Sequence, residues 1–164
     1  MDPQSGRKVT VSNNIFKLYD GEIEIKLPDD FVEMTEKEKY FNGSTPDYVF
    51  AVEKTNSLIS VTTANTENTN LKLEEEINKY ITLYRRIIPN FSNCKAARKT
   101  VKSGEEIGAF YFTSTLPDKD MFNLMAIICL EKKEVVITMH CELKDAVELA
   151  LRYMEVLENI VLLH

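Results

Sequence analysis

The stretch MFNLMAIICLEKKEVVITMHC, residues 121–141, contains two long apolar runs separated by a short charged segment. Apolar runs of this length, rich in Val, Ile and Met and joined by so few residues, are typical of two antiparallel strands. A two-residue turn at 132–133 would place Met125 opposite His140. The stretch therefore predicts a β-hairpin at the centre of the fold.

The predicted hairpin has two faces of different character, because successive strand residues point to opposite sides of a sheet. One face is wholly apolar and is formed by Leu124, Ala126, Ile128, Leu130, Val135, Ile137, Met139 and Cys141. The other face, which we call the mixed face, is formed by Asn123, Met125, Ile127, Cys129, Val136, Thr138 and His140. Apolar residues on both faces predict helices on both faces, or a partner on one of them.

The adjacent residues His140 and Cys141 invite the hypothesis of a reactive pair. In a strand their side chains point to opposite faces, so they would not meet. Cys129 would lie roughly 16 Å from Cys141, at about 3.3 Å per strand residue. A nucleophile with its base, or a metal shared by these three residues, is therefore not expected. The glycines never cluster in a phosphate-binding motif, so no cofactor is predicted.

The rest of the chain alternates strands with two helices. Two further hairpins are predicted upstream, in NIFKLYDGEIEIKLP (14–28) and around Thr55-Asn56 (47–64), with a charged loop between them. Helical periodicity covers 71–88 and ends at Pro89. Strands are expected again at 96–102 and 106–115. A last helix, at 143–163, is so broadly apolar that we expect it to be largely buried.

This order of elements predicts an α+β fold with a mainly antiparallel sheet, because the connections are too short for parallel crossovers. The length of 164 residues fits one domain at 14–164, preceded by a polar leader at 1–13. A net charge of −6 argues against nucleic acid or an anionic membrane as the partner. No export signal or spanning segment is recognised, so a cytoplasmic protein with reduced cysteines is expected.

The segment EIEIKLPDDFVEM, residues 22–34, resembles the opening of the Mog1/PsbP-like superfamily, including its DcrB-like and DUF1795-type members. In that superfamily an alternating strand ends in Pro, which is followed by a small or acidic residue and an aromatic one. Pro28 and Phe31 match this pattern, although Phe31 stands where Trp is common. The resemblance implies a three-layer α/β/α sandwich with helices on both faces of the sheet. It also implies a protein-binding role without catalysis.

The favoured function is thus a non-catalytic, cytoplasmic protein-binding module, such as an adaptor or a chaperone for a secreted effector. A toxin-neutralising immunity protein is a variant of this function. The partner would be held by exposed residues of the sheet, for which the candidates are Phe110, Phe112, Met125, Ile127 and His140. A second copy of the chain on the mixed face would make a homodimer. The alternative is an enzyme or small-ligand protein whose site lies near His140, with Thr138 and Asp120.

Overall fold

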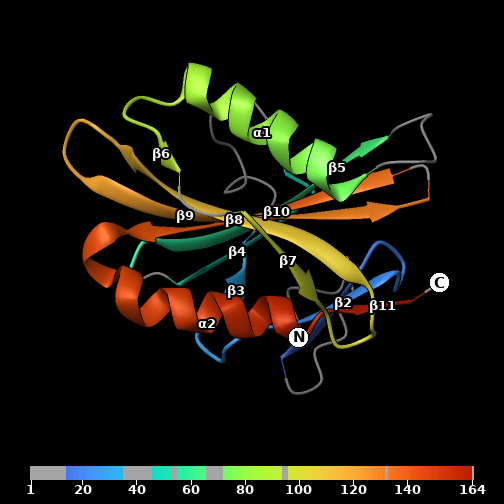
Figure 1. The fold of residues 1–164 in the computed structure, drawn as a ribbon. Helices are drawn as coiled ribbons and strands as arrows, with labels where there is room; N and C mark the ends of the chain where they lie inside the picture. The colour runs from blue at the N-terminus through green and yellow to red at the C-terminus, as the bar shows by residue number, and fades with distance from the viewer. Residues whose placement is uncertain are drawn as a thin grey trace.

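The computed structural model describes residues 14–34, 46–52, 55–65, 72–93, 96–131 and 133–163. The predicted leader at 1–13 and most of the charged loop between the first two hairpins lie outside these residues, as does Cys94. The described elements form two antiparallel sheets and two main helices (Figure 1).

The N-terminal hairpin forms as predicted, from β1 (Ile15–Leu18) and β2 (Ile23–Lys26). Its turn has a left-handed backbone at Tyr19, Asp20 and Gly21, with φ angles of +53°, +56° and +86°, and glycine adopts this conformation without strain. A short strand near the other end of the chain, β11 (Val161–Leu162), pairs with β2 and completes a three-stranded sheet. The predicted last helix therefore ends earlier than expected, because its final residues are in this strand.

The larger sheet has the order β3-β4-β5-β10-β9-β8-β6, with β7 also paired to β8, and every pairing is antiparallel. Its strands are β3 (Val32–Glu33), β4 (Tyr48–Val52), β5 (Ser57–Asn65), β6 (Ser92–Asn93), β7 (Ala97–Thr100), β8 (Glu106–Thr115), β9 (Asp120–Leu130) and β10 (Lys133–Glu142). The predicted mainly antiparallel sheet is confirmed. The two-residue strands β3 and β6 were not predicted.

The central hairpin, β9 and β10, pairs two residues away from the predicted register. Met125 lies opposite Thr138, and His140 lies opposite Asn123. The predicted pairing of Met125 with His140 is wrong because β10 already begins at Lys133, opposite Leu130. A shift of two residues leaves every side chain on its predicted face, whereas a shift of one would have reversed them all.

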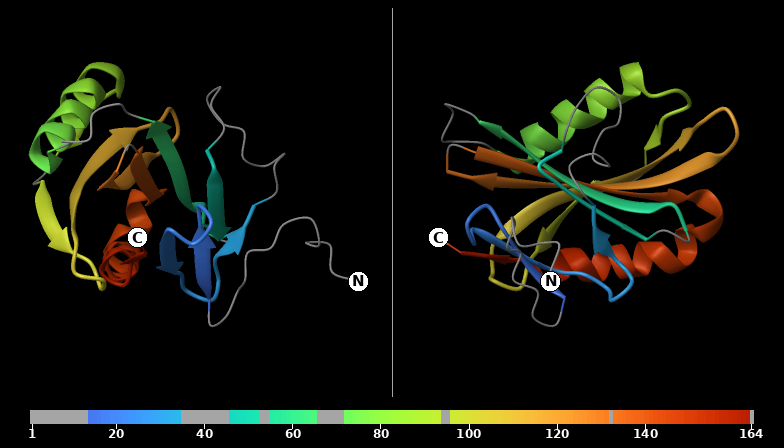
Figure 2. Two further views of the ribbon diagram at one scale, coloured as in Figure 1. Left: turned by 90° about the vertical axis from the view of Figure 1, so that its right-hand side faces the viewer. Right: turned by 180° about the vertical axis from the view of Figure 1, so that it is seen from behind.

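The two main helices pack on opposite faces of the larger sheet (Figure 1). Helix α1 (Leu73–Ile87) lies on the mixed face and buries Ile77 and Ile81. Helix α2 (Ala146–Glu158), after a 3₁₀ turn η1 (Leu143–Asp145), lies on the apolar face beside the three-stranded sheet (Figure 2). The predicted arrangement, with helices on both faces, is confirmed.

Two cores result from this layering. The larger core joins the apolar face to α2 and the three-stranded sheet, with Tyr153 and Phe50 among its fully buried side chains. The smaller core lies between the mixed face and α1. In the described parts of the chain, neither helix is long and apolar enough to cross a bilayer.

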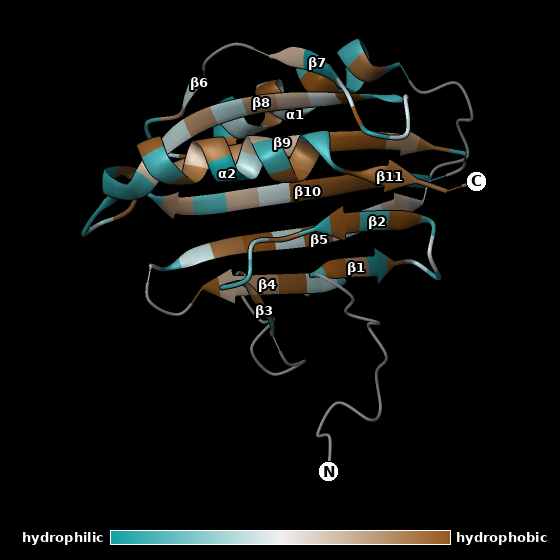
Figure 3. Ribbon diagram, turned by 90° about the horizontal axis from the view of Figure 1, so that it is seen from below, coloured by the Kyte–Doolittle hydropathy of each residue, from teal (hydrophilic) through white to brown (hydrophobic). Residues whose placement is uncertain are grey.

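Helix α2 is less buried than its composition predicts. It buries Leu149, Tyr153, Val156 and Leu157 against the larger core. Val147 and Leu151 remain 85% and 73% exposed. The prediction of a largely buried last helix is wrong because α2 is an outer layer, so only one of its sides contacts the rest of the protein (Figure 3).

Candidate functional site

Most of the residues predicted to hold a partner lie beneath α1. Four of the five are at most 3% exposed, namely Phe110, Phe112, Met125 and Ile127. They pack with Ile77 and Ile81, and the ring of Tyr84 lies 5.6 Å from that of Phe112. The expectation that these side chains are exposed is wrong, because α1 covers this part of the mixed face.

The fifth predicted residue, His140, belongs to a hydrogen-bonded network between β10, β9 and β8. Its Nδ1 lies 2.9 Å from Oδ1 of Asn123. The amide nitrogen of Asn123 donates to Oγ of Ser114 at 3.0 Å, so Oδ1 is left to accept from the imidazole. Burial lowers the pKa of His140 to about 4. The ring is therefore neutral near pH 7, with its proton on Nδ1.

Of the other polar residues of the enzyme alternative, Thr138 shares the mixed face with His140, two residues away on β10, whereas Asp120 does not. The hydroxyl of Ser114 is joined to the imidazole through Asn123 rather than directly. Asp120 lies at the start of β9, three residues before Asn123, and so points to the other face of the strand. Cys141 packs in the larger core, and burial raises the pKa of its thiol to about 11. The predicted separation of His140 from Cys141 is confirmed.

Metal-binding geometry is lacking in the parts of the chain that the structure describes, where no three His, Cys, Asp or Glu residues are grouped to hold an ion. Cys129 and Cys141 are both free thiols. They lie even further apart along the hairpin than predicted, because Cys129 is opposite Glu134 and Cys141 is opposite Phe122.

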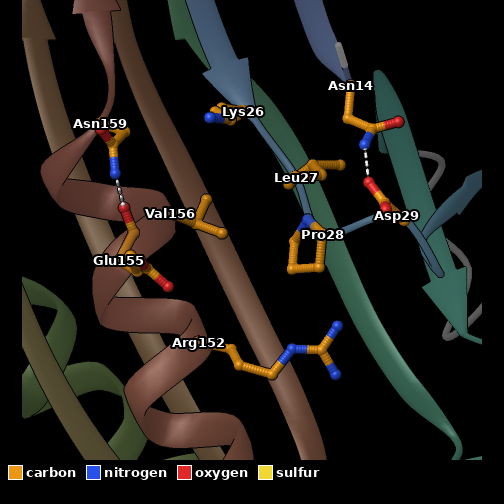
Figure 4. A pocket seen from close by; sticks show the side chains of 9 residues that line it. All are labelled: Asn14, Lys26, Leu27, Pro28, Asp29, Arg152, Glu155, Val156 and Asn159. Atoms are coloured by element: carbon orange, nitrogen blue, oxygen red, sulfur yellow. Dashed lines mark hydrogen bonds between the residues drawn. The ribbon is translucent and has the colours of Figure 1, made fainter.

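A cavity of about 260 Å³ separates α2 from the chain that leaves β2 (Figure 4). Its lining is formed by Asn14, Lys26, Leu27, Pro28, Asp29, Arg152, Glu155, Val156 and Asn159. Arg152 extends across it from α2, pairs with Asp30 and lies 5.7 Å from the ring of Phe31. Two basic and two acidic side chains balance the charge of the lining. The cavity therefore favours neither an anion nor a cation. The contacts of Arg152 connect the segment Leu27-Pro28-Asp29-Asp30-Phe31 to α2.

An apolar stripe runs along the outer side of α2 and its preceding turn. It consists of Leu143, Val147 and Leu151, four residues apart, with exposed fractions of 42%, 85% and 73%, and we call it the α2 stripe. Residues spaced by four lie on one side of a helix. Because contiguous exposed apolar residues mark interaction sites more often than scattered ones do, the α2 stripe is the candidate docking surface.

Acidic residues flank the α2 stripe. Glu148, Glu155 and Glu158 are all exposed on α2. Glu158 forms an ion pair with Lys99 of β7, at 3.6 Å. Lys144, next to Leu143, is also exposed and pairs with Glu142 at 3.5 Å, so the negative charge lies mainly beside Val147 and Leu151.

Comparison with known proteins gives no sequence relative, since no family model and no curated protein matches the chain. Solved structures do match. The cyanobacterial PsbP (CyanoP) of Synechocystis sp. PCC 6803 superposes with a TM-score of 0.68 over 99% of this chain and 100% of that one, at 11% identity. The chain has a Mog1/PsbP-like fold. The fold that the resemblance of residues 22–34 implied is thereby confirmed.

Two more solved structures share the Mog1/PsbP-like fold. LpqN of Mycobacterium tuberculosis, described as involved in cell envelope biogenesis, has a TM-score of 0.60, 11% identity, and coverage of 92% of this chain and 90% of its own. PA94 of Pseudomonas aeruginosa, a protein of unknown function described as a putative regulator, has a TM-score of 0.56, 10% identity, and coverage of 92% and 96%. At these identities the likeness establishes the Mog1/PsbP-like fold alone.

Proposed function

We propose that this chain is a non-catalytic protein-binding module whose docking surface is the α2 stripe. The observation that carries the proposal is the exposure of Val147 and Leu151, at 85% and 73%, on one side of a helix whose other side is buried. Leaving these side chains in water is unfavourable by about 1.5–3 kcal/mol each relative to full burial. A partner that covers them recovers part of that free energy.

The partner is best described by its chemistry. The α2 stripe matches apolar side chains at helical spacing, and the neighbouring Glu148 and Glu155 match Lys or Arg at the margins of such a segment. We therefore propose a basic amphipathic segment of another protein as the partner. Shielding a segment of this kind is the task of an adaptor or of a chaperone for a secreted effector.

The comparisons support a binding role only indirectly. LpqN is described as involved in cell envelope biogenesis and PA94 as a putative regulator, and both roles are compatible with protein binding. The cytoplasmic location expected from the sequence stays a prediction, as does the toxin-neutralising variant of the function.

The test replaces the apolar side chains of the α2 stripe by charged ones without weakening the helix. Val147→Glu together with Leu151→Glu removes most of the exposed apolar surface, and Glu is a good helix former. Ile87→Glu is the matched control, because Ile87 is 61% exposed near the end of α1 on the other side of the sheet. Tagged wild type and both variants are used for affinity capture from the native cell lysate, followed by titration of the purified partner.

We expect one stoichiometric partner that binds wild type and the Ile87 variant but is lost, by at least about tenfold in affinity, from the stripe variant. Glu148→Lys should slow association and weaken its dependence on salt. A partner retained equally by all variants would refute the α2 stripe as the docking surface. If light scattering shows a wild-type dimer that the stripe variant converts to a monomer, the occupant is a second copy of the chain and the proposed partner is wrong.

A further inference from the structure

A buried carboxyl group lies between α1 and the mixed face of the sheet. Glu134 on β10 is only 3% exposed. Its Oε1 accepts a hydrogen bond from the Tyr80 hydroxyl at 2.6 Å, and Nζ of Lys79 is 3.8 Å away. Its second oxygen, Oε2, is buried without a hydrogen-bond donor. An ionised carboxylate with an unsatisfied buried oxygen is strongly disfavoured, so the protonated, neutral form of Glu134 is favoured.

The place for that proton is set by Glu76, in the first turn of α1. Nζ of Lys79 lies 2.6 Å from Oε1 of Glu76 and 3.8 Å from Oε1 of Glu134, so the two carboxyls meet at one ammonium group. Two ionised carboxylates have only acceptors and repel, so a hydrogen bond between them requires one proton. Glu76 is the better anion, because Nζ of Lys79 donates to it at 2.6 Å. The proton therefore belongs on Glu134, which then donates to Glu76.

The neighbouring groups favour one proton rather than none. Burial, followed by the hydrogen bond to Glu76, raises the pKa of Glu134, while the hydrogen bond from Glu134 lowers the pKa of Glu76. Cys129 faces Glu134 from β9, and burial raises its pKa to about 11, so it stays an uncharged thiol. Lys133, the adjacent residue on β10, is paired with Glu22 at 2.6 Å. Of the described groups around this pair, Lys79 alone is cationic.

We propose that the carboxyl pair of Glu76 and Glu134 is a pH-sensitive contact between α1 and the sheet. One shared proton stabilises the packing of α1 on the sheet, and loss of that proton weakens it. The other attachments of α1 are the apolar packing of Ile77 and Ile81 and an exposed ion pair of Glu74 with Arg98 of β7, at 3.4 Å. Loosening α1 uncovers the apolar side chains of the mixed face that pack against it. The device therefore couples proton binding to the accessibility of the smaller core.

The sign of the effect follows from the direction of the Glu134 shift. A carboxyl whose folded pKa is raised contributes stability that is complete below its unfolded pKa and is lost as the pH rises through the folded value. Attachment of α1 is therefore tighter at mildly acidic pH than at alkaline pH. This dependence is opposite to that of an ordinary surface ion pair, whose carboxylate loses its charge in acid.

The decisive experiment is amide hydrogen exchange between pH 5 and pH 8, corrected for the intrinsic exchange rates. The observable is the protection of α1 amides relative to β9 amides in the same protein. Glu134→Gln cannot lose a proton, yet its amide accepts from Tyr80 and donates to Glu76, as the protonated acid does. Glu75→Gln is the matched control, because Glu75 is an exposed acidic residue in the same turn of α1.

We expect α1 protection in wild type and in the Glu75 variant to fall at least about tenfold from pH 5 to pH 8. In Glu134→Gln it should stay constant and exceed wild type at pH 8. Wild-type protection that is independent of pH, or the same slope in Glu134→Gln, would overturn the proposal. A ¹³C NMR titration of the wild-type carboxyl carbons is a second test that needs no variant. It should show two separated, coupled steps, and ordinary independent titration of both residues would equally refute the shared proton.

Discussion

Helix α1 approaches the sheet closely at Gly108 on β8, and replacing this glycine by alanine tests that packing. A Cβ atom at this position would lie 2.6 Å from Cδ1 and 2.7 Å from Cγ1 of Ile77. The optimal separation of two non-bonded carbon atoms is about 3.5–4.0 Å. Ile77 is 4% exposed and β-branched, so it has little freedom to turn away. Gly108→Ala therefore forces α1 outward by about 1 Å.

The expected change in the free energy of unfolding for Gly108→Ala follows from two opposing contributions. Overpacking of a core costs about 1–3 kcal/mol, while alanine is favoured over glycine in a strand by about 0.5–1 kcal/mol. The free energy of unfolding should thus fall by about 1–2 kcal/mol in an otherwise wild-type chain. In an Ile77→Ala background the clashing atoms are gone, and the added methyl fills vacated space, at about 0.8 kcal/mol per buried carbon. The same substitution should then raise stability by about 1 kcal/mol.

Urea unfolding of wild type, both single variants and the double variant, followed by circular dichroism, measures this coupling. We expect an interaction free energy of about 2–3 kcal/mol between positions 77 and 108, which is well outside experimental error. Ile81→Ala is the control background, because Ile81 is also buried on α1 but is not among the nearest neighbours of Gly108. Equal effects of Gly108→Ala in all backgrounds, within about 0.5 kcal/mol, would refute the close approach.

Three further outcomes are expected. Tyr153→Phe removes the 2.8 Å hydrogen bond from a fully buried hydroxyl to the His140 carbonyl. The free energy of unfolding, measured with urea, should fall by about 1–3 kcal/mol. An unchanged free energy of unfolding would show that this hydrogen bond does not stabilise the fold. The pKa of His140 is lowered to about 4, so charging this residue in acid destabilises the folded state. Relative to His140→Gln, wild type should lose at most about 3 kcal/mol of stability between pH 7 and pH 4. Parallel profiles of unfolding free energy against pH for the two proteins would contradict this. In a Cys94→Ser background, the buried Cys141 and the partly buried Cys129 should react with a disulfide reagent at least about 100-fold more slowly in the folded than in the unfolded protein, because both pKa values are near 11. Equal rates in the two states would contradict this protection.

The faces of the central hairpin could be predicted from the sequence, whereas its register could not. Strand alternation decides which side each residue takes, and the apolar set from Leu124 to Cys141 is long enough to settle it. The register depends on where the turn closes. Residues 131–133 are all charged, so no Gly, Asn or Pro marks the turn. Sequence patterns leave such a hairpin open to shifts of two residues.

Exposure was harder to predict than secondary structure. The mixed face was recognised correctly, but a pattern within the hairpin does not say that α1, some fifty residues upstream, covers it. For α2 the high average hydrophobicity predicted burial, whereas the helix has one buried and one exposed side. Projecting 146–158 on a helical wheel would have placed Val147 and Leu151 away from Leu149 and Tyr153. Contacts between distant segments, such as Tyr80 with Glu134, leave no local signal.

The pairing of β2 with β11 has a consequence for how the protein is made. Ile23 pairs with Leu162, so the three-stranded sheet joins residues from opposite ends of the described chain. During translation β1 and β2 emerge long before their partner strand β11, because nearly all the other described elements lie between them. Until β11 is made, the apolar side of this hairpin lacks part of its final cover, which favours slow completion of the fold. Early arrest of synthesis would therefore leave an aggregation-prone intermediate rather than a smaller stable domain.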